Sequence, residues 1–227
     1  MGGYYVEKLS GERLRRCYEI ASPRVIQYLE AEIQFVLERL ESTDKVLELG
    51  CGYGRVAFRL AEVANHVVGI DNAAESLELA HQLSSDDSRC EFLEMDALEL
   101  TFGDHEFDKV VCIQNGVSSF GVDQESLLRQ ALRVTRPGGC IYFSSYSERF
   151  WKDRLSWFEA QSDAGLLGEI DYDETGNNMI VCKDGFRTGI VTPDGFRTLC
   201  GKFGLDPEIT EVDESSVFCE IEVAEVV

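Results

Sequence analysis

Glycines at alternate positions follow a short apolar segment and form the strongest candidate for a ligand-binding loop. Residues 46–49 read VLEL, and Gly50, Gly52 and Gly54 come directly after them. Glycine lets the backbone turn tightly and approach a ligand closely, because it has no Cβ. In a doubly wound sheet, such a loop lies at the carboxyl edge of the strands, where ligands bind. The spacing therefore predicts a ligand site between a strand and a helix.

The same loop does not match the fingerprint G-x-G-x-x-G of dinucleotide-binding proteins. Counted from Gly50, the fingerprint requires glycine at Arg55, and counted from Gly52 it reaches Ala57. Alanine is tolerated at that last position, but the second count leaves two of the three glycines unexplained. Glu48 lies two residues before the loop, and a carboxylate there suits a cationic ligand better than a pyrophosphate. The loop therefore favours a ligand with positive charge.

Two further acids end the strands that are predicted to follow. Asp71 ends the second strand, where its carboxylate can accept from both hydroxyls of a ribose, and Asp96 ends the third, where it can accept from the exocyclic amine of adenine. Either acid could instead cap the turn or helix that begins after it. Together with the loop, the two acids favour an adenosine-containing ligand.

Strand and helix patterns alternate through the part of the chain that would position these residues. Apolar runs predict strands at 45–49, 66–70, 90–95, 107–113 and 140–144, and helices are expected at 54–64, 73–83 and 123–135. This alternation is typical of a parallel sheet with helices on both faces. Two helices, 10–21 and 23–40, are expected before the sheet. A helix at 193–203 and an antiparallel pair of strands, 205–212 and 217–226, are expected to close the chain.

Taken in order, these motifs resemble those of the class I S-adenosylmethionine-dependent methyltransferases. Residues 48–54 (ELGCGYG) resemble the first motif of that family, Asp71 its ribose-binding acid and Asp96 its adenine-contacting acid. Residues 107–111 (FDKVV) look like its fourth motif, and 133–139 (RVTRPGG) like the turn before its fifth strand. The resemblance is close from residue 45 to 145 and holds in outline for the last two strands.

The resemblance implies an α/β fold with a doubly wound, mostly parallel seven-stranded sheet in the order 3-2-1-4-5-7-6, whose seventh strand is antiparallel. It implies a single domain: an N-terminal helical cap (1–44), a cofactor-binding core (45–145), a substrate-side insertion (146–192), and the last helix with the closing strands (193–227). The implied cofactor is S-adenosyl-L-methionine. The residues expected to hold it are Glu48, Gly50, Cys51, Gly52, Gly54, Asp71, Asn72, Asp96, Ala97, Gln114 and Asn115.

The methyl acceptor is expected to bind beside residues 114–119 (QNGVSS) and the insertion. Candidate acceptor-site residues are Tyr5, Ser118, Tyr146 and Trp151. Aromatic residues and acids in the insertion favour an amine acceptor weakly. However, residues 150, 154, 157 and 158 recur at helical spacing, which favours packing in the core, and the acids at 169–174 are most simply a solvated turn. No catalytic base is assigned, because the three histidines lie in the predicted scaffold.

Composition limits the partners. A formal net charge of −21 weighs against nucleic acid or an anionic membrane as substrate, which favours a small-molecule acceptor. The eight cysteines include no Cys-x-x-Cys pair and do not cluster with histidine, so we expect free thiols, no metal site and a cytoplasmic location. No apolar run is long enough to span a bilayer. Nothing in the sequence specifies an oligomeric state.

Two alternatives stay open at this point. One is a nicotinamide-dependent oxidoreductase on a Rossmann fold, and the other is a non-catalytic protein that binds S-adenosylmethionine. The early third glycine and Glu48 count against the first alternative. Retained binding residues do not by themselves imply turnover, so the second alternative is not excluded by the motifs.

Overall fold

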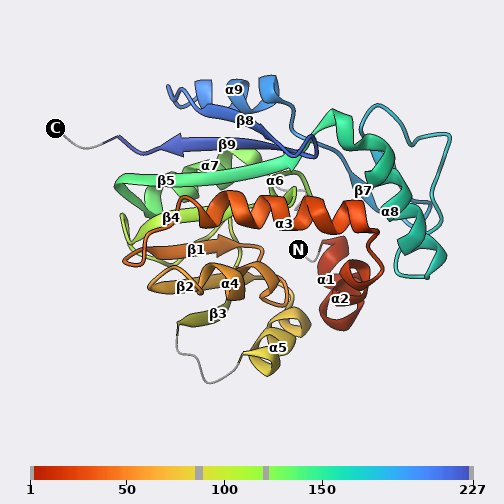
Figure 1. Ribbon diagram of the computed structural model, residues 1–227, viewed down its shortest axis with the longest axis horizontal. Helices are drawn as coiled ribbons and strands as arrows, with labels where there is room; N and C mark the ends of the chain where they lie inside the picture. The colour runs from red at the N-terminus through yellow and green to blue at the C-terminus, as the bar shows by residue number, and fades with distance from the viewer. Residues whose placement is uncertain (1–2, 85–88, 120–122, 225–227) are drawn as a thin grey trace.

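The computed structural model describes residues 3–84, 89–119 and 123–224 and is built around one seven-stranded sheet (Figure 1). The strands lie in the order β3-β2-β1-β4-β5-β9-β8. The first five are parallel, while β9 runs antiparallel to both of its neighbours. In chain order, the predicted seventh strand is β9 and the sixth is β8. The predicted fold class and strand order are therefore confirmed.

The parallel strands end where the sequence places its glycine loop and acids. Their bounds are β1 Lys45–Leu49, β2 His66–Asp71, β3 Cys90–Glu94, β4 Phe107–Cys112 and β5 Thr135–Tyr146. The closing hairpin joins β8 Glu208–Val212 to β9 Ser216–Glu222. The carboxyl ends of β1, β2 and β4 share one edge, because β1 pairs with both of the others in parallel register.

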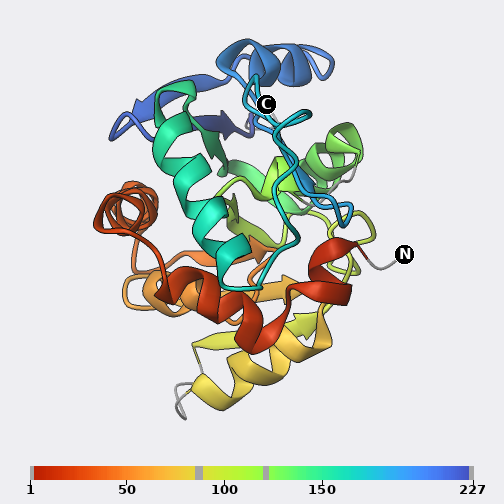
Figure 2. The same ribbon diagram turned by 90° about the vertical axis from the view of Figure 1, so that its right-hand side faces the viewer.

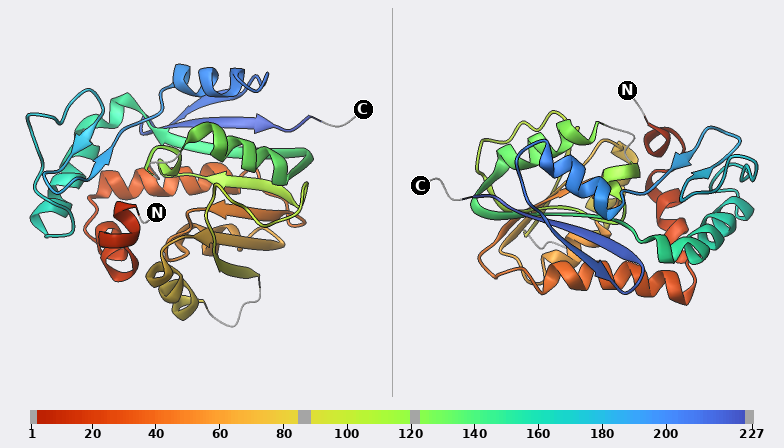
Figure 3. Two further views of the ribbon diagram at one scale, coloured as in Figure 1. Left: turned by 180° about the vertical axis from the view of Figure 1, so that it is seen from behind. Right: turned by 90° about the horizontal axis from the view of Figure 1, so that it is seen from above.

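Helices cover both faces of the sheet, as Figure 3 shows. One face packs against α3 Pro23–Leu37, α4 Arg55–Leu60 and α5 Ala74–Leu83, which share a buried apolar cluster with β1, β2 and β5. The other face packs against α6 Gly116–Ser119, α7 Gln124–Val134 and α9 Pro193–Gly201. Each strand of the sheet centre is consequently buried on both sides, which explains its continuous apolar sequence.

The N-terminal helices and the insertion pack on each other beyond the carboxyl edge of the sheet (Figure 2). The N-terminal part contains α1 Tyr4–Lys8 and α2 Gly11–Glu19. The insertion contains the 3-10 turn η1 Glu148–Phe150, α8 Trp151–Asp163 and the small strands β6 Ile180–Val181 and β7 Arg187–Thr188. Their shared apolar cluster includes side chains from α2, α3 and α8. Within the described residues, no helix combines the length and apolarity that crossing a membrane requires.

Two boundaries differ from the predictions. The fifth strand begins at Thr135, five residues before the predicted start, and it contains the Pro-Gly-Gly turn as a bulge. The bulge stays in the sheet because Gly138 donates to the carbonyl of Val223, and Val223 donates to that of Gly139. The first helix of the core is also shorter than predicted and ends at Leu60, after which the chain forms turns.

Candidate functional site

The glycine loop turns sharply between β1 and α4 at the carboxyl edge of the sheet. The amides of Gly50 and Cys51 both donate to the carbonyl of Ile70 at the end of β2, at 2.8 and 2.9 Å. Gly52 and Gly54 adopt φ values of 54° and 84°, in the left-handed region that favours glycine. A Cβ on Gly54 would lie 2.7 Å from a ring carbon of Phe92. The loop therefore depends on glycine both for its dihedrals and for its packing.

Asp71 ties this loop to the next helix. One carboxylate oxygen accepts from the amide of Gly52 and the other from the amide of Ala73, both at 2.8 Å. Burial raises the pKa of Asp71, and the backbone donors partly offset this. A carboxylate has about four lone-pair sites, so further donors can still be accepted. Asn72, the next residue, is exposed.

Glu48 is buried and Arg55 is half-buried beside the glycine loop, and each has one shielded polar atom without a partner among the described residues. Glu48 is only 5% exposed, and burial raises its pKa to about 8 despite the attraction of Arg55. Neither its Oε2 nor the Nη2 of Arg55 has a hydrogen-bond partner among the described residues. The guanidinium lies 4.6 Å from the ring centre of Tyr18. Buried polar atoms are normally satisfied, so these two orphaned atoms point to a ligand that carries both charges.

The end of β3 supplies the third acid. Asp96 is exposed, and its Oδ1 accepts from the amide of Leu98 at 2.8 Å, which is the local turn contact that the sequence allowed as an alternative role. Ala97 is partly buried against the core cluster below it. Both residues lie at the same sheet edge as Asp71, because β3 pairs in parallel with β2.

Gln114 and Asn115 follow β4 and both have positive φ, of 57° and 63°. The amide of Gln114 donates to Glu32 on α3 at 2.6 Å and lies 2.8 Å from the hydroxyl of Ser144, while its side-chain Nε2 is buried without a partner among the described residues. The side chain of Asn115 is fully buried and bonds the hydroxyl of Ser145 and the carbonyl of Gly189. Gln114 thus presents a free donor, whereas Asn115 anchors the insertion.

A small cavity of about 50 Å³ lies between the N-terminal helices and the insertion; we call it the acceptor chamber. Its lining includes two of the candidate acceptor-site residues, Tyr5 and Tyr146, but neither Trp151 nor Ser118. Trp151 packs at the edge of the cluster formed by the N-terminal helices and the insertion, and Ser118 lies beside Gly189. The full lining is Tyr5, Leu9, Leu14, Cys17, Tyr18, Tyr28, Leu29, Gln114, Tyr146, Trp157, Phe158 and Gln161.

Sequence reasoning missed the contribution of α3 to this site. Tyr28 and Glu32 are both fully buried, and burial raises the pKa of Glu32 to about 7. They are four residues apart and therefore share one face of the helix. The available signal was a glutamate inside the apolar stripe of an amphipathic helix, where a carboxylate is rarely found without a partner.

The N-terminal segment covers the loop and the chamber. Ser10 donates to Glu75 at 2.8 Å, and the amide of Gly11 donates to Ser76, so α2 is attached to α5. A methyl carbon of Leu14 lies 3.0 Å from the position of a Cβ on Gly52. Leu14 therefore touches the glycine loop and also lines the acceptor chamber.

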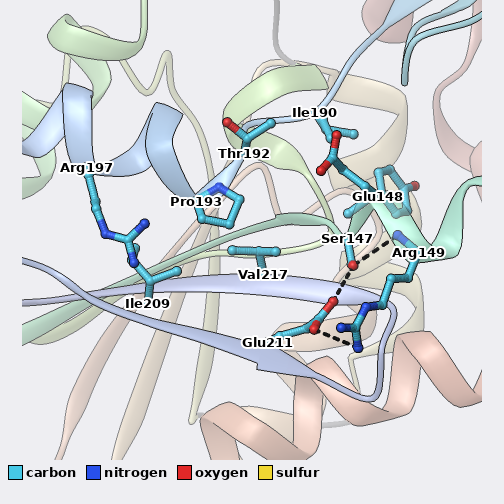
Figure 4. Close-up of a pocket in the computed structure, with 11 residues that line it drawn as sticks. Ser147, Glu148, Arg149, Ile190, Thr192, Pro193, Arg197, Ile209, Glu211 and Val217 are labelled. Carbon is cyan, nitrogen blue, oxygen red and sulfur yellow. Dashed lines mark hydrogen bonds and ion pairs between the residues drawn. The ribbon is translucent and has the colours of Figure 1, made fainter.

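A larger cavity of about 300 Å³ lies beside the β8–β9 hairpin (Figure 4), and Tyr146 is part of its lining as well. Apolar residues such as Val217 and Ile209 form part of its lining. At one end Ser147 donates to Glu211 at 2.5 Å, and Arg149 pairs with the same carboxylate. None of the predicted cofactor-binding residues lines this cavity.

The cysteines and the insertion aromatics contribute packing, including part of the chamber lining, and no reactive group. All eight cysteines are free thiols, and burial raises the pKa of Cys51 well above its usual value. Among residues 3–84, 89–119 and 123–224, no three His, Cys, Asp or Glu side chains are grouped so that they could hold a metal ion. The insertion aromatics Phe150, Trp157 and Phe158 are buried in a core cluster, as their helical spacing predicts.

Comparison with known proteins agrees with this geometry. Residues 46–139 match the family model described as a methyltransferase domain. The PH0226 protein from Pyrococcus horikoshii has a similar structure, with a TM-score of 0.67 and 23% identity over 89% of this chain and 92% of that one. Residues 46–139 therefore resemble a methyltransferase domain, and the fold of the chain is that of this solved neighbour. The predicted resemblance to S-adenosylmethionine-dependent methyltransferases is therefore confirmed.

Other relatives of this chain differ in the acceptors that their names give. An arsenite methyltransferase from Aquipseudomonas alcaligenes is 34% identical over 55% of this chain and 38% of its own length. A 27-O-demethylrifamycin SV methyltransferase from Amycolatopsis mediterranei is 29% identical over 76% of this chain and 57% of its own. The N-methyltransferase NodS from Bradyrhizobium japonicum, solved with S-adenosyl-L-homocysteine, has a TM-score of 0.60 at 15% identity, over 90% of this chain and 89% of NodS. The chain spans about half or less of the length of the first curated relatives it matches.

Proposed function

We propose that this protein transfers the methyl group of S-adenosylmethionine to a small-molecule acceptor. The observation that carries the proposal is that Glu48 and Arg55, of opposite charge and both beside the glycine loop, each have one shielded polar atom without a partner among the described residues. The amino-acid end of S-adenosylmethionine carries an ammonium and a carboxylate. Those two groups complement a carboxylate and a guanidinium respectively.

Each end of the cofactor has a corresponding set of residues. Glu48 would accept from the ammonium, Arg55 would donate to the carboxylate, and Gly52 allows the backbone to approach closely. Asp71 would accept from the ribose hydroxyls, while Asp96 would accept from the adenine amine. Asn72, Ala97 and the remaining loop positions Gly50, Cys51 and Gly54 would form the walls between them.

When bound, the cofactor supplies an activated methyl group on a sulfonium, so the chain needs no nucleophile of its own. Its contribution is to align the accepting atom with that methyl group and to keep water away. Alignment alone can lower a barrier by about 7–11 kcal/mol in favourable cases. The acceptor chamber fits this role, because Gln114 and Leu14 line it and also lie beside the strand ends or the glycine loop.

A small molecule is the proposed acceptor class. Named relatives act on arsenite and on a rifamycin, and the net charge of −21 opposes binding to a phosphate backbone. An amine acceptor, which the insertion aromatics and acids weakly favoured, loses that support. The aromatic side chains at 157 and 158 are buried and line the acceptor chamber with no carboxylate in that lining to pair with a cation, and the acidic turn around Tyr172 is exposed. We therefore do not include an amine in the proposal.

The two alternatives receive no support from a specific observation. The relatives named above are methyltransferases, and none of them is an oxidoreductase. A non-catalytic binding protein would retain the Glu48–Arg55 pair but would have no need for a covered chamber beside it.

An acceptor screen tests the proposal. The protein is incubated with S-adenosylmethionine and pools of small hydroxyl, thiol and amine compounds, and formation of S-adenosylhomocysteine is followed. We expect turnover with at least one pool that the Asp71→Ala variant loses. Binding of the cofactor without turnover above background in any pool would favour the non-catalytic alternative.

A further inference from the structure

The side chains that line the acceptor chamber are uncharged near neutral pH. Its lining has six aromatic side chains and two amides, and none of its twelve residues is Asp, Glu, Lys, Arg or His. A cavity of 50 Å³ can hold roughly four water molecules, so it admits a small group such as the polar end of a larger acceptor. A charged group that entered it would lose its hydration without gaining an ion partner, which costs several kcal/mol.

Two polar atoms in this lining have no partner among the described residues. They are the hydroxyl oxygen of Tyr28 and the side-chain Nε2 of Gln114, and both are fully shielded from solvent. Tyr28 comes from α3, whereas Gln114 follows β4, so two separate elements bring unsatisfied groups to one cavity. An unmade hydrogen bond of a buried group costs about 1–3 kcal/mol, which a bound molecule would recover.

Two charged side chains behind the lining make several other contacts, and the Nε of Arg154 and the Oε1 of Glu32 have no partner among the described residues. Arg154 stacks 4.4 Å from the ring centre of Tyr146, and it donates to the carbonyls of Asn178, Thr188 and Gly189. Glu32 accepts from the backbone amide of Gln114 at 2.6 Å. These groups fix the walls of the chamber, and Glu32 acts as a positioning residue for Gln114.

We propose that the acceptor chamber binds the methyl acceptor through an uncharged oxygen group, held by the Tyr28 hydroxyl and the Gln114 amide N–H. The inference rests on the proposed function, because it identifies the second substrate of the same site. The Tyr28 hydroxyl can donate or accept, so the Gln114 N–H is the group that selects the ligand. An amide N–H can only donate, so it requires an acceptor lone pair, which a hydroxyl oxygen has and an ammonium lacks. A carboxylate has lone pairs but would be buried as an anion with no cation in the lining.

A series of one-ring probes tests this selectivity. Binding of benzyl alcohol, benzylammonium and benzoate, which are similar in size, is measured by calorimetry on the protein saturated with S-adenosylhomocysteine. Phenol serves as a smaller uncharged probe. We expect benzyl alcohol or phenol to bind at least tenfold more tightly than either ion.

Variants separate the two polar groups from the general shape of the chamber. Tyr28→Phe keeps the ring and removes only the hydroxyl, whose neighbouring hydroxyl is that of Tyr146, so the variant should fold. Loss of the new hydrogen bond should weaken phenol binding about three- to tenfold. Gln114→Met should have a similar effect. The control is Tyr172→Phe, which alters an exposed tyrosine bonded to Glu159 and should leave phenol binding unchanged.

The outcomes are distinguishable from failure of the proposed function. Equal or tighter binding of benzylammonium or benzoate would overturn the inference. So would absence of binding by all four probes to protein that has bound S-adenosylhomocysteine, or wild-type affinity for phenol in both chamber variants. If the protein binds no S-adenosylhomocysteine at all, the proposed function fails as well.

Discussion

The buried carboxylate of Glu48 should make cofactor affinity depend on pH in a calculable way. Its pKa of about 8 in the free protein results from burial, and it is moderated by Arg55 and raised further by Asp71. If the ammonium of the cofactor requires the ionised form, affinity follows the ionised fraction, 1/(1 + 10^(8−pH)). This fraction rises roughly tenfold per pH unit below 7, or about 30-fold from pH 5.5 to 7. An α-amino group stays protonated over that range, because its pKa is about 7.7–8.0.

The assay is calorimetric titration with S-adenosylmethionine at pH 5.5, 6, 6.5 and 7. We expect the wild-type dissociation constant to fall across the series. The Glu48→Gln variant should bind weakly and with little dependence on pH. Glu208→Gln, at an exposed position on β8, should behave as wild type. A flat wild-type series, or the same pH dependence in Glu48→Gln, would refute the role assigned to Glu48.

Three further predictions concern the elements that hold the site. Arg154→Met should lower the free energy of unfolding by about 2–4 kcal/mol, because three carbonyl oxygens lose a charged donor. Urea titration measures this loss. An effect no larger than that of Lys152→Met would contradict the structural role assigned to Arg154. Gly54→Ala should weaken binding of S-adenosylhomocysteine at least tenfold, because φ is 84° there and a Cβ would meet an aromatic carbon at 2.7 Å. Gly201→Ala, where a Cβ meets nothing within 4 Å, should leave binding unchanged, and equal affinities of the two variants would contradict the strain argument. Glu32 has a pKa of about 7 in the folded protein, above its usual 4.5, so protonation of Glu32 stabilises the fold. This contribution to the free energy of unfolding is complete below about pH 4.5 and is lost as the pH rises through 7. Glu32→Gln should therefore become more stable than wild type by about 3 kcal/mol between pH 5 and 8, and a constant difference in denaturation midpoints would contradict this.

The sequence was sufficient for the sheet because each parallel strand carries its own end signal. Gly50 and Asp71 stop β1 and β2 at the same edge, and a continuous apolar run marks β4 as buried on both faces. The bulge before β5 was not predictable in this way. Its Pro-Gly-Gly residues are typical of a turn, and only the pairing of Gly138 and Gly139 with Val223 keeps them in the sheet.

The candidate site was predictable on the cofactor side and only partly on the acceptor side. Motif spacing identifies the loop and Asp71, because those contacts are made within neighbouring strands. Tyr28 and Glu32 come from a helix far away in the chain. Whether they reach the site depends on which face of α3 packs toward the end of β4. Asn115 illustrates the same difficulty, since its side chain bonds the insertion through residues more than seventy positions away.

Binding of S-adenosylmethionine by wild-type protein and by the Asp71→Ala variant tests the central claim most directly, with NAD as the competing ligand in the calorimeter. We expect the wild-type protein to bind S-adenosylmethionine with a dissociation constant in the micromolar range. Loss of the ribose contacts in Asp71→Ala should weaken binding of S-adenosylmethionine about a hundredfold, since two hydrogen bonds to a carboxylate are each worth about 1.5 kcal/mol. NAD should not bind. A folded wild-type protein that binds NAD, or that binds no S-adenosylmethionine, would contradict the account.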